Sequence, residues 1–234
     1  MIQTIRAILV AGATAISGGA MAEDSPVVVE LFTSQGCSSC PPADEMLAEM
    51  AGRDDIIALA LHVDYWDYIG WADSFGSPAW TARQHRYARA AGANTVYTPQ
   101  FVVGGVDHVV GAKGMDLMDL IRAHDQQADP VTIDLRRSGG RVHLSASWHE
   151  GAPRNAVVQI VSYLPMAEVE IRRGENAGRT LAYANIVTGW QIVERWTGRA
   201  PLTLTLPPAQ GQHSVVLIQE DGQGPILAAA RLPN

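Results

Sequence analysis

Both cysteines of this chain lie in one short segment, Cys37-Ser38-Ser39-Cys40, directly after the apolar run Val27–Phe32. An apolar strand that leads into C-x-x-C and then a helix is the usual way in which a protein presents a redox-active dithiol. Because the chain has no third cysteine, any disulfide within it joins Cys37 to Cys40. The segment therefore predicts a strand, a tight loop and a helix in this order.

The close spacing of the two cysteines bears on what a bridge between them would do. In the chain-entropy model a loop of about four residues gains only about 2 kcal/mol from its disulfide, against about 4.7 kcal/mol for a loop of roughly a hundred residues. A structural zinc ion needs four ligands, and the pair supplies two. Reversible thiol chemistry is therefore favoured. An inert bridge and a site for a soft ion such as Cu(I) remain as alternatives.

The composition of the 234 residues is that of a globular protein, with 47% hydrophobic and 18% charged residues. The length suits one large domain or two small ones. A net charge of −7 gives no electrostatic reason to bind nucleic acid or an anionic membrane. We expect no cofactor, and we assign no metal ligand.

The first 22 residues have the features of a signal peptide. Arg6 is their only charged residue, an apolar stretch follows it, and Ala20-Met21-Ala22 is an A-x-A cleavage signal. The stretch is short for a membrane span, although an uncleaved anchor is an alternative. We expect a periplasmic or secreted protein that begins at Glu23 and has no membrane span. An oxidising compartment would keep the two cysteines as a disulfide at rest.

The first half of the chain alternates strands and helices. We expect a strand over Val27–Phe32, a helix over Pro42–Met50 and a strand over Ile56–Val63, which together make a βαβ unit with parallel strands. A helical insert rich in aromatic residues follows at about 65–94. The last predicted elements of this half are two strands and an amphipathic helix, over Phe101–Val103, His108–Val110 and Gly114–Gln127.

The composition changes at Asp129-Pro130, after which short alternating strands and turns follow one another. The predicted strands are Val131–Leu135, Val142–Trp148, Ala156–Leu164, Glu168–Ile171, Leu181–Val187, Gln191–Arg195, Leu202–Leu206, Ser214–Gln219 and Ile226–Ala230. Strands at this spacing favour an antiparallel β-sandwich. We therefore expect an α/β domain over residues 23–128 and a β-rich, sandwich-like domain over residues 129–234.

The first half resembles the thioredoxin fold. The resemblance rests on the apolar strand, the C-x-x-C that opens a helix, the second parallel strand, and Thr98-Pro99 before a β-hairpin and a last helix. It implies that Pro99 is a cis proline that faces the dithiol. It also implies that Tyr97, Thr98 and Pro99 form the wall along which an extended substrate binds.

A closer resemblance is to a family of uncharacterised exported bacterial proteins with the signature LFTSQGCSSCPPAD. The matching segments are Leu31–Asp44, His62–Trp71, Arg83–Tyr87 and Tyr97–Gln100. Two features depart from ordinary thioredoxins. The residues between the cysteines are Ser38-Ser39, and Pro41-Pro42 follows the second cysteine. Because prolines are tolerated where a helix begins, we expect the regular helix to start near Pro41.

These patterns favour an exported thiol–disulfide oxidoreductase that acts on protein or small thiols together with a redox partner protein. Cys37 lies at the loop end nearer to solvent and is the candidate attacking thiolate, which helix amides stabilise. Cys40, one turn further in, is the candidate resolving cysteine. The alternative is a non-enzymatic periplasmic module that binds Cu(I) or a protein partner through the dithiol and the β-rich domain.

Several other residues have structural interpretations first. We expect His62 to be a packed or hydrogen-bonded residue rather than a catalytic one. The tryptophans Trp66, Trp71 and Trp80 are expected in the core or at a domain contact rather than on a substrate platform. Arg83 and Arg86 are expected on a solvated helix face. The segment from Gly174 to Thr180 is expected to be a turn, with binding by an exposed Asn-Arg loop as the alternative.

Overall fold

The computed structural model describes residues 25–209, 211 and 213–233, so the predicted signal peptide at residues 1–22 lies outside the described part. The first half forms β1 (Val27–Thr33), α1 (Pro41–Met50), β2 (Ile56–His62), the 3-10 helix η1 (Asp67–Ile69), α2 (Pro78–Ala90), β3 (Gln100–Val103), β4 (Asp107–Val110) and α3 (Gly114–Asp125). The second half forms β5 (Val131–Ser138), β6 (Arg141–Trp148), β7 (Ala156–Glu170), β8 (Thr180–Trp196), β9 (Leu202–Thr205), β10 (His213–Glu220) and β11 (Ile226–Arg231). Among the described residues, no helix combines the length and the apolar character needed to cross a membrane.

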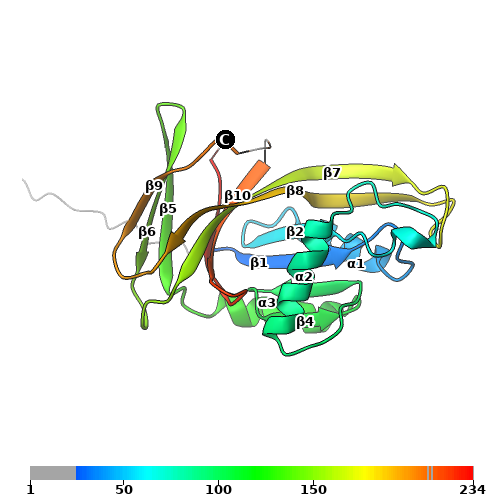
Figure 1. Ribbon diagram of the computed structural model, residues 1–234, viewed down its shortest axis with the longest axis horizontal. Helices are drawn as coiled ribbons and strands as arrows, with labels where there is room; N and C mark the ends of the chain where they lie inside the picture. Colours follow the sequence, from blue (N-terminus) through cyan, green and yellow to red (C-terminus); the bar gives the residue numbers. More distant parts are fainter. Residues whose placement is uncertain (1–24, 210, 212, 234) are drawn as a thin grey trace, which may run out of the picture.

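Eight strands of the described residues form one large sheet (Figure 1). Their order across the sheet is β11-β10-β7-β8-β2-β1-β3-β4. Within it, β2 runs parallel to β1 and to β8, and the other neighbouring pairs are antiparallel. The chain is therefore a mixed α/β protein with a large, mostly antiparallel sheet and few helices.

The large sheet crosses the boundary that the sequence suggested at residue 129. β8, from the second half, pairs with β2 at Ala60 and Ile186. Next to this pair, Asn185 Nδ2 donates a hydrogen bond of 2.9 Å to the carbonyl oxygen of Ala58. All seven residues of β2 are buried, and a buried strand without a neighbour would leave backbone N–H and C=O groups without partners. This requirement explains why the two halves share a sheet instead of forming separate ones.

The remaining three strands form a second sheet in the order β5-β6-β9. Its apolar side chains pack against those of β7, β10 and β11 in one buried cluster. The apolar side chains of the second half thus lie between this small sheet and one end of the large sheet. β7, β10 and β11 come from the second half, and they also form one end of the large sheet, which continues into the first half.

β7 and β8 are each a single long strand where the sequence suggested two short ones. Pro165 lies between the two short strands predicted for β7, and Gly189 lies between the two predicted for β8. Among the described residues, β10 pairs with β7 only as far as Tyr163, so Pro165 lies beyond that ladder and costs it no hydrogen bond. β8 passes Gly189 with a shift in register beside Ser162. The tip of the long β7–β8 hairpin lies at the end of the molecule away from the small sheet of β5, β6 and β9 (Figure 1).

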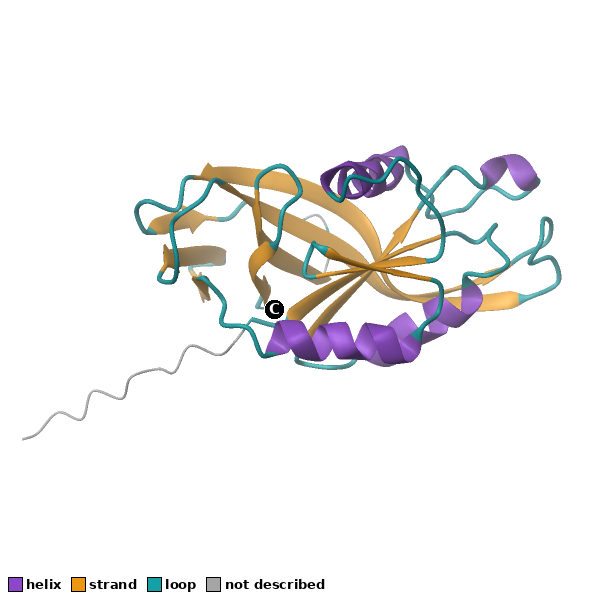
Figure 2. Ribbon diagram, turned by 90° about the horizontal axis from the view of Figure 1, so that it is seen from below, coloured by secondary structure: helices purple, strands orange, loops and turns teal. Residues whose placement is uncertain are grey.

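The helices cover the two faces of the large sheet (Figure 2). α1 and α3 pack on one face, against alternate residues of β1 that include Val27, Val29 and Leu31. α2 packs on the other face, where Val28 and Phe32 of β1 meet its buried aromatic residues. The period of two along β1 therefore supplies a core to both faces.

Glu30 is the one charged residue of β1, and it faces α2. Arg83 of α2 is only 3% exposed, which corrects the expected solvated position, and its Nε lies 2.6 Å from Glu30 Oε2. Tyr87 donates its hydroxyl proton to Glu30 Oε1 over 2.6 Å, and the Arg83 guanidinium stacks on the Trp190 ring at 3.7 Å. Burial lowers the pKa of Arg83 and is the largest single effect, but Glu30 and Tyr87 together outweigh it, so the pKa of Arg83 is raised. Arg86 is exposed, as expected.

Candidate functional site

A disulfide joins Cys37 to Cys40 in the loop between β1 and α1, with 5.4 Å between the two Cα atoms. The loop begins where β1 leaves the centre of the sheet, and Cys40 is the N-cap residue of α1. α1 starts at Pro41, which confirms the helix start predicted from the two prolines. The central strand and the helix therefore fix both ends of the dithiol loop.

The backbone amides of the dithiol loop are largely engaged. Cys37 N–H donates to the carbonyl oxygen of Ser34 at 3.1 Å, and Cys40 N–H donates to that of Cys37 at 3.2 Å. Pro41 and Pro42 follow and have no N–H to donate. A thiolate at Cys37 would consequently find few free amides at the start of α1, although the helix dipole remains.

The two sulfur-bearing residues are covered. Cys37 is 2% exposed and Cys40 is fully buried, whereas Ser38 and Ser39 between them are exposed. The Sγ atom of Cys37 lies 3.5 Å from the hydroxyl of Ser39. Thiol–disulfide exchange depends on access to the attacked sulfur, so whatever covers Cys37 controls the chemistry of this site.

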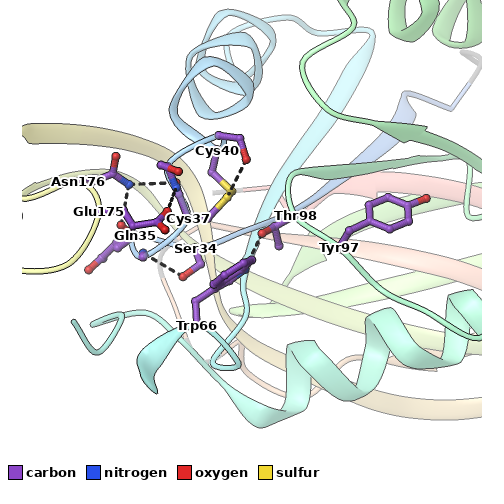
Figure 3. The surroundings of a disulfide bond; sticks show 12 residues. Ser34, Gln35, Cys37, Cys40, Trp66, Tyr97, Thr98, Glu175 and Asn176 are labelled. Carbon is purple, nitrogen blue, oxygen red and sulfur yellow. Dashed lines mark hydrogen bonds between the residues drawn. A yellow bond between two sulfur atoms is a disulfide. The ribbon is translucent and has the colours of Figure 1, made fainter. Parts of the chain in front are cut away.

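The tip of the β7–β8 hairpin, residues 171–179, forms one wall around the dithiol loop (Figure 3). Asn176 is 2% exposed, and its Nδ2 donates to the carbonyl oxygens of Gln35 at 2.9 Å and Cys37 at 3.0 Å. Arg179 Nη1 donates to Asn176 Oδ1 at 3.1 Å and so fixes the orientation of the amide. Glu175 Oε2 accepts a hydrogen bond of 3.3 Å from Ser38 N–H. This hairpin tip is therefore bonded to the loop at three points.

Trp66 forms the opposite wall. A Cβ placed on Gly36 would lie 3.2 Å from the Cβ of Trp66, so only glycine fits this position without a shift. The indole Nε1 of Trp66 donates to Thr98 Oγ1 at 2.7 Å. Trp71, also half-buried, donates from Nε1 to Gln35 Oε1 at 2.9 Å. These tryptophans thus contact the dithiol loop, whereas Trp80 lies in the core as expected.

Tyr97, Thr98 and Pro99, the residues of the predicted substrate wall, differ in how they lie relative to the dithiol loop. The Thr98–Pro99 peptide bond is cis, as the resemblance implied. Thr98 is linked to the dithiol loop through Trp66, and Pro99 is buried. The Tyr97 ring points away from the disulfide (Figure 3). The backbone carbonyl oxygen of Tyr97 accepts a hydrogen bond from Gln84 Nε2 at 2.8 Å. The structure therefore does not bring the Tyr97 side chain to the dithiol.

A buried polar cluster that includes Asp44, His62 and Asp73 lies next to the dithiol loop. His62 Nδ1 lies 2.8 Å from Asp73 Oδ2, and the same oxygen accepts the N–H of Gln35 at 2.7 Å. His62 is therefore a paired, buried residue, as expected. Within the described residues, neither carboxylate oxygen of Asp44 has a hydrogen-bond partner, nor does His62 Nε2. Burial raises the pKa of Asp44 to about 7, while nearby His62 and the Thr33 hydroxyl act in the lowering direction.

Comparison with known proteins identifies the family. A family model described as a protein of unknown function, DUF1223, matches residues 28–219. The chain belongs to the DUF1223 family. A crystal structure of an Agrobacterium tumefaciens protein is 35% identical, with a TM-score of 0.76 over 90% of this chain and 95% of that one.

HBP35 of Porphyromonas gingivalis is similar in fold alone, at 13% identity and a TM-score of 0.56, over 89% of this chain and 74% of that one. No protein with a curated description matches. The DUF1223 match agrees with the resemblance to an uncharacterised bacterial family, and that family carries no assigned reaction.

Sequence reasoning missed several residues around the disulfide of this DUF1223 chain. Glu175 and Asn176 lie in the segment predicted as a turn, and they reach a loop that is 139 residues away in the chain. The signal available was the pair of glycines that flank them. Gly174 and Gly178 have φ angles of +76° and +82°, which glycine adopts readily. Glycines of this kind predict a shaped turn, but not the segment that the turn contacts.

Proposed function

We propose that this chain is an exported thiol–disulfide oxidoreductase-like protein whose Cys37–Cys40 pair exchanges with thiols. The observation that carries the proposal is the disulfide itself, held at the junction of a central strand and a helix. A bridge over so short a loop adds little stability. Contacts from two separate segments, the hairpin tip and the connection between β2 and α2, nevertheless hold this loop in place, as a reactive group requires.

A thioredoxin-like arrangement of residues 25–128 is part of the proposal. It is supported by the strand order β2-β1-β3-β4, in which β1 and β2 are parallel and β3 and β4 antiparallel. It is supported further by α1 and α3 on one face and α2 on the other, and by the cis peptide bond at Pro99. In this arrangement the second half of the chain extends the sheet beyond β2.

The proposed exchange begins with a thiolate that attacks Cys37 Sγ. The Cys37–Cys40 bond breaks, a bond from Cys37 to the incoming sulfur forms, and Cys40 leaves as a thiolate that takes up a proton. Attack at Cys37 is favoured because Cys40 is fully buried, whereas Cys37 keeps 2% exposure and is followed by the exposed Ser38. When a second thiol of the partner attacks the mixed disulfide, Cys37 is released and two electrons have passed to the protein.

The amide pattern favours a reducing rather than an oxidising dithiol. A dithiol protein is a strong oxidant when its reduced form is stabilised, as at a thiolate that helix amides surround. Here the N–H of Ser38 is directed to the Glu175 carboxylate, and Pro41 and Pro42 have none. The Glu175 charge also opposes a thiolate beside it. The reduced form is therefore weakly stabilised, and the disulfide is correspondingly hard to reduce.

Export remains part of the proposal and rests on the signal-peptide features of residues 1–22. Expression of the full chain in a bacterial host, followed by N-terminal sequencing of the periplasmic fraction, tests it directly. The expected mature terminus is Glu23. A full-length chain in the cytoplasmic fraction would contradict export.

Single-cysteine variants test the exchange reaction. Cys37→Ser should abolish exchange with glutathione, because it removes the attacked and attacking sulfur. Cys40→Ser should accumulate a mixed disulfide at Cys37 that mass spectrometry detects, because no resolving thiol remains. Ser38→Ala, in the same loop, changes an exposed side chain, keeps the backbone N–H that bonds to Glu175, and is the matched control that should exchange like the parent protein.

The same variants separate the proposal from the Cu(I) alternative. Tight Cu(I) binding by the reduced protein, lost in both cysteine variants and accompanied by no glutathione exchange, would favour the metal-binding module. Exchange in the parent protein that is unaffected by either cysteine substitution would end the oxidoreductase proposal.

A further inference from the structure

The hairpin tip, residues 171–179, comes from the far half of the chain and lies against the dithiol loop. It is anchored at its own base, where Ile171 is fully buried and its N–H donates to the carbonyl oxygen of Arg179 at 2.8 Å. A Cβ on Gly174 would lie 3.3 Å from the Cβ of Trp71, so the tip packs closely against Trp71. The tip is therefore a fixed part of the site rather than a loop that happens to pass it.

Asn176 is the residue through which the tip holds the dithiol loop. Its amide nitrogen bonds to the carbonyl oxygens on either side of Gly36, those of Gln35 and Cys37. Only a side-chain amide offers two donors on one nitrogen and an acceptor that Arg179 can bind. The amide is buried, so separating tip and loop without water entry would leave three polar groups unpaired.

The consequence of this contact is steric. Cys37 is 2% exposed. The Glu175 carboxylate accepts a hydrogen bond from the N–H of Ser38, the residue after Cys37. A thiolate must approach the attacked sulfur from the side opposite the bond that breaks. A small thiol needs a local displacement of the loop to do so. A cysteine on a folded protein brings a wide surface with it, which requires the tip itself to move away.

We propose that the hairpin tip makes the Cys37–Cys40 pair selective for small thiols over thiols of folded proteins, with Asn176 as the residue that determines this specificity. The inference rests on the proposed exchange function and names its substrate class. The step is the one described above: a small dithiol gives two electrons to the disulfide, becomes oxidised to its own disulfide, and leaves Cys37 and Cys40 as thiols.

The test compares two reductants on one protein. Rates of reduction by dithiothreitol and by a reduced, folded thioredoxin are followed through tryptophan fluorescence, in the parent protein and in Asn176→Ala. Comparing each reductant with itself across the two proteins cancels the difference in driving force between reductants. We expect Asn176→Ala to accelerate reduction by thioredoxin at least about ten-fold and reduction by dithiothreitol less than about three-fold.

Two further variants make the result decisive. Asn155→Ala changes an exposed asparagine outside the tip and should leave both rates unchanged. Glu175→Ala changes an exposed residue of the tip, preserves the buried amide, and should accelerate thioredoxin alone, by a smaller factor than Asn176→Ala. If Asn176→Ala lacks the circular dichroism spectrum of the parent protein, the rates of Glu175→Ala alone decide whether the tip sets the selectivity.

The outcomes separate this inference from the proposed function. If Asn176→Ala accelerates reduction by both reductants equally, the proposed selectivity is overturned. It is likewise overturned if neither tip variant accelerates reduction by thioredoxin. Both results leave the exchange reaction intact. A native disulfide that dithiothreitol itself does not reduce overturns the proposed function instead.

Discussion

Asp44 occupies a position one turn after Cys40 where a carboxyl group is costly. Asp44 is 5% exposed, and the two oxygens of its carboxyl group have no hydrogen-bond partner among the described residues. Burial raises its pKa to about 7, from an ordinary value of 3.8. The folded protein therefore holds a proton on Asp44 between about pH 4 and pH 7 that the unfolded chain has released. Stability falls with rising pH across this window.

Replacing Asp44 by asparagine removes this dependence. We expect the free energy of unfolding of the parent protein to decrease between pH 4 and pH 7 by an amount on the order of a few kcal/mol from this group. Asp44→Asn should be flatter over the same window and more stable than the parent at pH 8, as measured by urea unfolding. Glu49→Gln, on an exposed position of the same helix, is the control. Parallel pH profiles for parent and Asp44→Asn would contradict the account.

At the scale of elements, the sequence predicted most helices and strands because their signals are local. Each of three signals acts on its own surroundings: the apolar run Val27–Phe32, the two prolines that begin α1, and the turn at Gly104-Gly105. Pro165 and Gly189 misled the prediction, since a break in pattern ends a strand only if the break costs a hydrogen bond. The position of Arg83 was also missed, because only the docking of α2 onto β1 shows that it meets Glu30.

The Glu30–Arg83 pair gives an element-scale prediction about how α2 is held. Arg83→Met should destabilise the protein by about 3–5 kcal/mol, because it leaves the buried Glu30 carboxylate without its cation. Denaturant unfolding at neutral pH measures the change. Arg86→Met, on the exposed side of the same helix, should change stability by less than about 0.5 kcal/mol. Similar effects of both substitutions would show that the buried pair does not hold α2.

At the scale of the whole molecule, the candidate site depends on contacts that no local pattern reveals. The sequence placed the two cysteines together, and it implied the cis proline through a resemblance. It did not reveal that Asn176 of the far half would hold the dithiol loop. That contact follows from the pairing of β8 with β2, which sets the direction of the long hairpin. Pairing between distant strands is decided by the whole sheet and not by either strand's own residues.

The shared sheet predicts that the first half is not stable alone. A fragment of residues 25–128 would expose the β2 edge that β8 covers and would lose Asn176 from the dithiol loop. We expect it to aggregate or to lack a cooperative thermal transition by circular dichroism, whereas residues 25–234 unfold cooperatively. A monomeric fragment with a sharp transition would instead show that the boundary at residue 129 separates independent folding units.

The reduction potential of the Cys37–Cys40 pair shows whether the disulfide forms and breaks reversibly, as the proposed exchange requires. Equilibration of the native protein with glutathione or dithiothreitol redox buffers, followed by thiol alkylation and mass spectrometry, gives the value. The engaged amides and the Glu175 carboxylate predict a reversible two-electron couple between about −300 and −200 mV, near thioredoxin and far from the oxidant DsbA. A disulfide that stays intact in every native-state buffer would mark an inert bridge and contradict the account.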